Sequence, residues 1–146
     1  NPQETSGENA GSGPPTWRWN ASVTYDLMRF SGTFSARGIS EGVYDNDFIE
    51  CTSNCPTSTT ANPTINDNHV DGATYFDLAL NYTMFDGNAG GPEVELYANV
   101  RNLLNEDPAV VANGPGGVPF DTHPTNPANF DVFGRVYRVG VRVRGF

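Results

Sequence analysis

Two cysteines are the residues of this chain whose chemistry is easiest to anticipate. Cys51 and Cys55 are close together in CTSNC, a spacing that permits a disulfide and suggests an oxidising compartment. The alternatives are two free thiols or half of a metal site. Only His69 and His123 could complete such a site, and they lie at no standard zinc spacing. The sequence favours the disulfide.

Four charged residues could act through electrostatics. Glu93 and Glu95 fall on the polar side of one alternating segment, and Arg142 and Arg144 fall on the polar side of another. Opposite charges on neighbouring strands contribute roughly 0.2–1 kcal/mol per pair. We expect these residues to form a structural charge ladder in a wet lumen. A role in a substrate path is the alternative.

The remaining polar residues show no catalytic pattern. No Ser/His/Asp or Cys/His arrangement is legible, so we expect no enzymatic activity and no cofactor. The acidic residues of the first long loop could offer oxygen ligands to calcium, but DND and NDN are too short to indicate a site. A solvated loop without a metal is favoured. These acidic residues are Asp45, Asp47, Glu50, Asp67 and Asp71.

Composition narrows the class of protein. The chain has 146 residues, enough for one domain, but only 37% are apolar, and the net charge is −9 with eight arginines and no lysine. Such an acidic chain is a poor partner for nucleic acid. No apolar run approaches the ~20 residues of a spanning helix. With no signal peptide and no initiator methionine, the sequence suggests a piece of a longer protein.

Five segments alternate between apolar and polar residues, which is the pattern of a strand with two different faces. They are TWRWNASVTYDL (16–27), RFSGTFSARGISEGVY (29–44), ATYFDLALNYTMF (73–85), PEVELYANVRNLL (92–104) and FGRVYRVGVRVRGF (133–146). Two connections are short, at 26–29 and at DGNAGG, and two are long and structureless, at 45–72 and 105–132. The pattern predicts an all-β antiparallel meander of about five long strands, organised as in a large transmembrane β-barrel.

The alternation also predicts which residues share a face. The expected outer, lipid-facing residues are Phe76, Leu78, Leu80, Tyr82, Val94, Leu96, Val100, Val139, Val141 and Val143, and Met84 continues this side of its segment. The expected inner residues are Asp77, Asn81, Glu93, Glu95, Asn99, Arg101, Arg138 and Arg142. Aromatic residues fall mostly near the segment ends, where interfacial girdles lie.

Three stretches carry a resemblance to a known family. NLLNEDP (102–108) follows the strand-like VELYANVR, GRVYRVGVRVRGF ends the chain, and VYDNDFIECTSNCPTSTTANPTINDNHVDGATYFDLALNY joins a loop to a strand. Together they resemble the C-terminal end of a TonB-dependent outer-membrane receptor, over most of residues 16–146. The family folds as a plugged barrel of about 22 strands.

The resemblance implies a location and partners. Residues 16–146 would be the last five strands of a barrel in the outer membrane of a Gram-negative bacterium, and residues 1–15 a remnant of an extracellular loop. Partners would be the lipid bilayer, the barrel-assembly machinery and, through upstream regions, the TonB system. The whole receptor would actively import a scarce small-molecule or chelate substrate, such as a siderophore, a vitamin or an oligosaccharide.

The resemblance also implies an assembly signal in the terminal strand. Its residues would be Tyr137, Val139, Val141, Val143 and Phe146. Phe146 departs from the family pattern because its even number places it out of phase with the valines. A bulge assisted by Gly145 would return Phe146 to the lipid face.

Two other classes of protein remain open on the sequence. The runner-up is a secreted β-sandwich that binds carbohydrate, with its aromatic residues as sugar platforms. The third is a small self-contained β-sheet protein from a truncated gene. Solubility separates the receptor from the β-sandwich, because the wide apolar faces of the receptor require detergent or lipid. The absent start and signal sequence favour a fragment over the self-contained protein.

Overall fold

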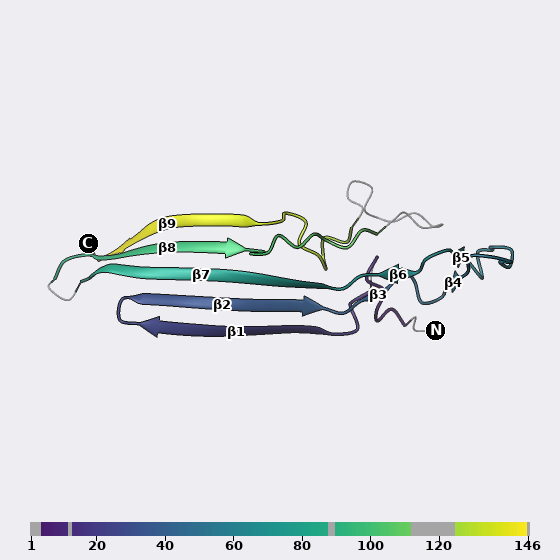
Figure 1. The fold of residues 1–146 in the computed structure, drawn as a ribbon, viewed down its shortest axis with the longest axis horizontal. Coiled ribbons are helices and arrows are strands. Elements are labelled where there is room, and N and C mark those ends of the chain that lie inside the picture. The colour runs from purple at the N-terminus through teal and green to yellow at the C-terminus, as the bar shows by residue number, and fades with distance from the viewer. Residues whose placement is uncertain (1–3, 12, 88–89, 112–124, 146) are drawn as a thin grey trace. The chain divides into compact units, whose positions relative to one another are not determined.

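The computed structural model of this chain is built from β-strands. It describes residues 4–11, 13–87, 90–111 and 125–145. Five strands form one sheet: β1 (Arg18–Leu27), β2 (Phe30–Ile39), β7 (Ala73–Asp86), β8 (Glu93–Arg101) and β9 (Val136–Arg144). They are hydrogen-bonded in the order β1-β2-β7-β8-β9, so neighbours in the chain are neighbours in the sheet (Figure 1). The predicted antiparallel meander is therefore confirmed, and the described residues include no helix.

The first long connection is more ordered than the sequence predicts. β3 (Gly42–Val43) pairs antiparallel with β6 (His69–Val70). β4 (Ile49–Glu50) pairs parallel with β5 (Thr64–Ile65). The prediction of a structureless loop at 45–72 is therefore wrong. Its backbone finds hydrogen-bond partners within the loop, in the β4–β5 pair, and just before it, in β3. These partners are distant in sequence, so no local sequence pattern predicts them.

The second strand is shorter than its alternating pattern. It was expected to continue to Tyr44 but ends at Ile39. The amide of Val43 instead donates to the carbonyl of Gly7 at 2.8 Å, and a Cβ at Gly42 would lie 2.2 Å from that same oxygen. Close approach of another backbone therefore redirects the chain here, and only glycine permits it.

Contacts divide the chain into two compact units. The first comprises residues 1–19, 38–73 and 107–132, and the second comprises residues 20–37, 74–106 and 133–146. The first unit buries polar side chains as well as apolar ones. Asn9 is fully buried, and its side chain donates to the carbonyl of Ser40 at 2.8 Å. Asn126 in turn donates to the backbone oxygens of Asn9 and Gly11 at 3.0 Å.

The register of the second unit gives its sheet two distinct faces. Leu80 opposes Ala98, which opposes Val139, and Tyr82 opposes Leu96, which opposes Val141. Directly opposed residues share a face, so these rows form one apolar surface. Phe34 and Phe76 extend it, with ring centroids 5.6 Å apart. The opposite face is polar; on it, the hydroxyls of Thr24 and Thr33 are 2.8 Å apart.

One position of the predicted apolar face is wrong. The register shifts between Thr83 and Phe85, so that Phe85, not Met84, opposes Val94. An extra residue in one strand reverses the alternation beyond it. The bulge places the aromatic ring of Phe85 on the apolar face, where simple alternation would have placed the thioether of Met84.

Aromatic rings cover glycines on both faces of the sheet. A Cβ at Gly140 would lie 2.5 Å from the hydroxyl of Tyr97, which opposes it on the polar face. A Cβ at Gly38 would likewise lie 2.3 Å from the indole nitrogen of Trp19. Each ring occupies the space that a side chain would fill. A strand glycine, which otherwise weakens a sheet, here provides room for packing.

Replacing Gly140 by alanine tests this packing. The added methyl group must displace the Tyr97 ring, and overpacking of this kind costs about 1–3 kcal/mol, more than the roughly 0.5–1 kcal/mol that alanine gains over glycine in a strand. We expect Gly140→Ala to lower the free energy of unfolding by about 1 kcal/mol. Gly91→Ala is the control, because a Cβ at Gly91 meets nothing within 4 Å.

A double-mutant cycle in a denaturant titration makes the cause explicit. In a Tyr97→Ala background the ring is gone, and Gly140→Ala should then be neutral or stabilising. The same loss of stability in both backgrounds would show that the Tyr97 ring is not what occupies the space.

Candidate functional site

The polar face of the sheet gathers most of the charged side chains of the second unit. Its charges fall in two groups, one beside the short turns and one at the opposite ends of the strands. Near the short turn, Glu93 opposes Arg144 and Glu95 opposes Arg142. The other group comprises Arg37, Asp77, Arg101 and Arg138.

The structure brings together the four residues of the predicted charge ladder. Arg144 Nη1 lies 2.9 Å from Glu93 Oε1, and Arg142 Nη1 donates to Glu95 Oε1. The guanidinium of Arg142 also lies 5.5 Å from the centre of the Tyr97 ring. The Glu95 side chain is only 15% exposed, against 37% for Glu93. The Glu95–Arg142 pair is therefore the better protected from water and from salt.

The second charged group centres on Asp77. Arg37 Nε lies 3.6 Å from Asp77 Oδ2, and the Arg37 guanidinium lies 4.4 Å above the Tyr75 ring, which is buried. The other carboxylate oxygen of Asp77 accepts a hydrogen bond from the amide of Asn102 at 2.8 Å. The charge of Asp77 therefore has a cation on one side and a backbone donor on the other.

Two asparagines after β8 fix the end of this group, and sequence reasoning missed their role. Asn102 and Asn105 have φ of 50° and 57°, in the left-handed region that asparagine tolerates better than most residues. The side chain of Asn102 exchanges two hydrogen bonds of 2.8 Å with the backbone of Glu106. Asn105 Oδ1 accepts from the amide of Arg135 at 3.0 Å. The NLLNE stretch is thus a turn stabilised by its asparagine side chains. The two asparagines, three residues apart, are the sequence feature that could have predicted it.

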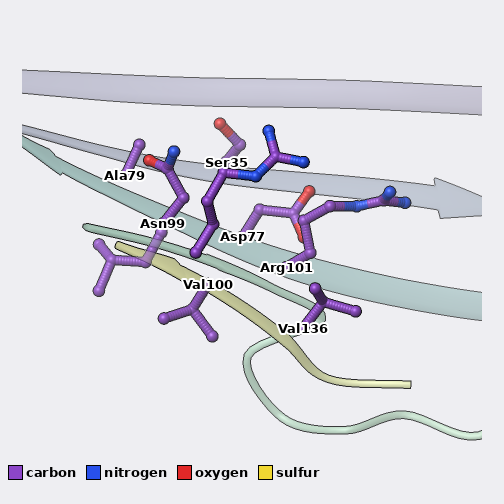
Figure 2. A pocket seen from close by; sticks show the side chains of 9 residues that line it. Ser35, Asp77, Ala79, Asn99, Val100, Arg101 and Val136 are labelled. Atoms are coloured by element: carbon purple, nitrogen blue, oxygen red, sulfur yellow. The ribbon is translucent and has the colours of Figure 1, made fainter. Parts of the chain in front are cut away.

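A pocket of about 360 Å³ opens beside Asp77. Figure 2 shows Ser35, Asp77, Asn99 and Arg101 projecting to one side of the sheet, whereas Val100 points to the other. The lining residues are Ser35, Asp77, Leu78, Ala79, Asn99, Val100, Arg101, Val136 and Arg138. Two arginines and one aspartate give this lining a net positive charge, in a chain whose overall charge is −9.

The loop cysteines form a disulfide, with Cα atoms 5.6 Å apart. The amide of Cys51 also donates to the carbonyl of Ile65 at 2.8 Å, next to the β4–β5 pair. His69 Nε2 lies 3.1 Å from Asp71 Oδ1. Among the described residues, no group of three or more histidine, cysteine or acidic side chains could hold a metal ion.

The terminal strand presents its predicted residues to solvent. Tyr137, Val139, Val141 and Val143 occupy alternate positions of β9 and are all exposed. Gly145 has φ of 84°, a left-handed conformation outside the range of a regular strand. Phe146 and His123 lie outside the residues that the structure describes.

The two ion pairs of the ladder should differ in strength. Double-mutant cycles with Glu95→Gln and Arg142→Gln, and with Glu93→Gln and Arg144→Gln, measure each coupling free energy by denaturant titration. We expect about 0.5–1 kcal/mol for the half-buried Glu95–Arg142 pair, retained largely in 0.5 M salt, and less for the exposed Glu93–Arg144 pair. Equal coupling free energies for the two pairs, both lost in 0.5 M salt, would contradict this difference.

The disulfide predicts the reactivity of the cysteines. When the mature protein is denatured without reductant, a thiol reagent should label neither Cys51 nor Cys55, because both sulfurs are bonded to each other. Reduction before labelling should make both react, which provides the positive control. Quantitative labelling of both cysteines without reductant would reject the bond.

The described residues contain no helix that is long and apolar enough to span a membrane. Comparisons with known proteins give no relative: no protein-family model, no curated protein and no solved structure matches this chain. The chemistry of the two sheet faces is therefore the main guide to its function.

Proposed function

We propose that this chain forms the last five strands of a TonB-dependent receptor in the outer membrane of a Gram-negative bacterium. The observation that carries the proposal is the contrast between the two faces of the sheet. One face is apolar and exposed, and the other bears ion pairs and an arginine-rich pocket. Lipid on one side and a water-filled lumen on the other would satisfy both faces.

The exposure of the apolar face supports a membrane. Val139 is 77% exposed, Tyr137 is 67% exposed, and Val23 and Tyr25 are about as exposed. Contiguous apolar surfaces of this kind are rare on proteins that remain monomeric in water. Strand lengths support it as well, because β1 and β2 have ten residues each and β8 and β9 have nine. A tilted transmembrane strand needs about 9–11 residues.

The edges of the sheet support a larger assembly. Within the described residues, β1 and β9 each have a hydrogen-bonded neighbour on one side only. Successive strands alternate in direction (Figure 1), so β1 and β9 run the same way. An antiparallel barrel that includes them needs an odd number of further strands between β9 and β1, which gives the even total of bacterial barrels. These strands would belong to the same receptor.

The receptor proposal assigns roles to the remaining features. The two long connections would lie on the substrate side, and the exposed residues of β9 would serve recognition by the barrel-assembly machinery. Upstream regions would supply the plug and the contact with the TonB system. The imported solute would be a siderophore, a vitamin or an oligosaccharide. These roles rest on the resemblance of NLLNEDP and GRVYRVGVRVRGF to that family.

Substituting neighbouring residues of β7 tests the orientation of the sheet. Leu80 lies on the apolar face and Asn81 on the polar face. In the receptor folded into lipid vesicles, Leu80→Arg should lower the free energy of unfolding by roughly 2–4 kcal/mol if it lies near the midplane, because arginine would meet hydrocarbon. Asn81→Arg, the matched control, should change it little because the added charge would meet water.

Heat-modifiable mobility on a denaturing gel shows in parallel whether each variant has folded. An unchanged unfolding midpoint for Leu80→Arg in lipid would count against the orientation. A protein that stays monomeric in buffer without detergent or lipid would instead favour a soluble fold such as the secreted β-sandwich.

A further inference from the structure

We infer that the pocket beside Asp77 is a subsite for a small anion, or for the anionic group of a larger solute, bearing carboxylate or phosphate. The anion chemistry rests on the side chains of the pocket. Its assignment to the imported solute rests on the proposed receptor function. Arg138, Asn99 and Ser35 supply the donors, and Arg101 adds positive charge.

Arg138 differs from the other arginines on the polar side of β9. Arg142 and Arg144 each pair with a glutamate of β8, whereas Arg138 opposes the neutral Asn99. Among the described residues, the guanidinium of Arg138 makes neither an ion pair nor a side-chain hydrogen bond. The strand thus carries two arginines that support the sheet and one whose five N–H donors remain available.

The neutral side chains of the pocket add donors of the same kind. The amide of Asn99 and the hydroxyl of Ser35 also make no side-chain hydrogen bond to any described residue. Figure 2 shows both projecting to the same side of the sheet from different strands. Asn99 shares this side with Arg138, because the two residues oppose each other in the register. Three donor groups that bond to no described residue therefore line one pocket.

The single carboxylate of the pocket does not cancel this positive charge. Asp77 is held by Arg37 at 3.6 Å and by the amide of Asn102 at 2.8 Å. Its charge is therefore largely compensated by groups that do not line the pocket. The guanidinium of Arg138 then leaves a local positive charge at the pocket. A cation would be repelled here, and a neutral solute would leave the guanidinium of Arg138 without a counter-charge.

The geometry of a guanidinium selects the chemical class of the ligand. Its planar fork matches the oxygens of a carboxylate or a phosphate, to which it donates two parallel hydrogen bonds. A volume of about 360 Å³ is at the small end of ligand sites and suits one such group with a short organic body. Because the pocket opens on the polar face, the ligand would arrive from the aqueous side.

Calorimetric titration with citrate and with inorganic phosphate tests the subsite. The full protein is folded into vesicles of zwitterionic lipid at low ionic strength, and glucose serves as the neutral probe. We expect one or both anions to bind and glucose not to bind. Arg138→Gln should weaken the binding at least tenfold. The affinity of Arg138→Lys should lie between those of the unchanged protein and Arg138→Gln, because lysine keeps the positive charge but loses the planar fork of donors.

Arg135→Gln is the matched control, because Arg135 lies outside the pocket lining and its guanidinium is 6.0 Å from the Tyr137 ring. It should bind the anions as the unchanged protein does. Binding of citrate alone would define a carboxylate subsite, and binding of phosphate alone a phosphate subsite. Absence of binding to either anion, or equal binding by Arg138→Gln, would overturn the inference.

The outcomes separate this inference from the receptor proposal. Insertion into vesicles, shown by heat-modifiable mobility, without anion binding would reject the subsite and leave the receptor proposal standing. A protein that stays monomeric in plain buffer, and whose binding of citrate or phosphate depends on Arg138, would support the subsite and reject the receptor proposal. Arg138→Gln and Arg138→Lys must show the mobility of the folded protein, so that a loss of binding is not a loss of folding.

Discussion

The side-chain period of two along hydrogen-bonded strands is the constraint on which this structure depends. A shift of one residue between neighbours would move every apolar side chain of a strand to the polar face. Such a slip at β8–β9 would also separate Glu93 and Glu95 from Arg144 and Arg142. The apolar rows and the ion pairs therefore specify the same register from opposite sides of the sheet. Their agreement is the consistency across levels that allows a sequence to select one arrangement.

The irregular positions adapt this alternation to local demands. The bulge at Met84 reverses the facing so that Phe85 joins the apolar surface. Gly140 leaves space for the Tyr97 ring, over which Arg142 also lies. Asn102 adopts a left-handed conformation, stops β8 and offers its amide to Asp77. Each departure is made by a residue suited to it. Of these departures, the turn at Asn102 holds a charged group of the pocket, because its backbone N–H donates to Asp77.

The five strands and the charge ladder could be predicted because both depend on alternation within a segment and on pairing between chain neighbours. Four features could not be predicted. The Met84 bulge shifts the register without changing the composition of its segment, and the β3–β6 and β4–β5 pairs join residues distant in sequence. The burial of Asn9 depends on contact with Ser40 and Asn126. The pocket could not be predicted because its lining residues come from different strands, and only the register between the strands brings them together.

The central claim is that one face of the sheet meets lipid and the other meets water. Spin labels placed singly at Val139 and Arg138, neighbours on opposite faces of β9, test it directly in lipid vesicles. We expect the label at Val139 to collide mainly with oxygen, which dissolves in hydrocarbon, and the label at Arg138 to collide mainly with a water-soluble nickel chelate. Equal access of the nickel chelate to both labels in folded protein would contradict the account.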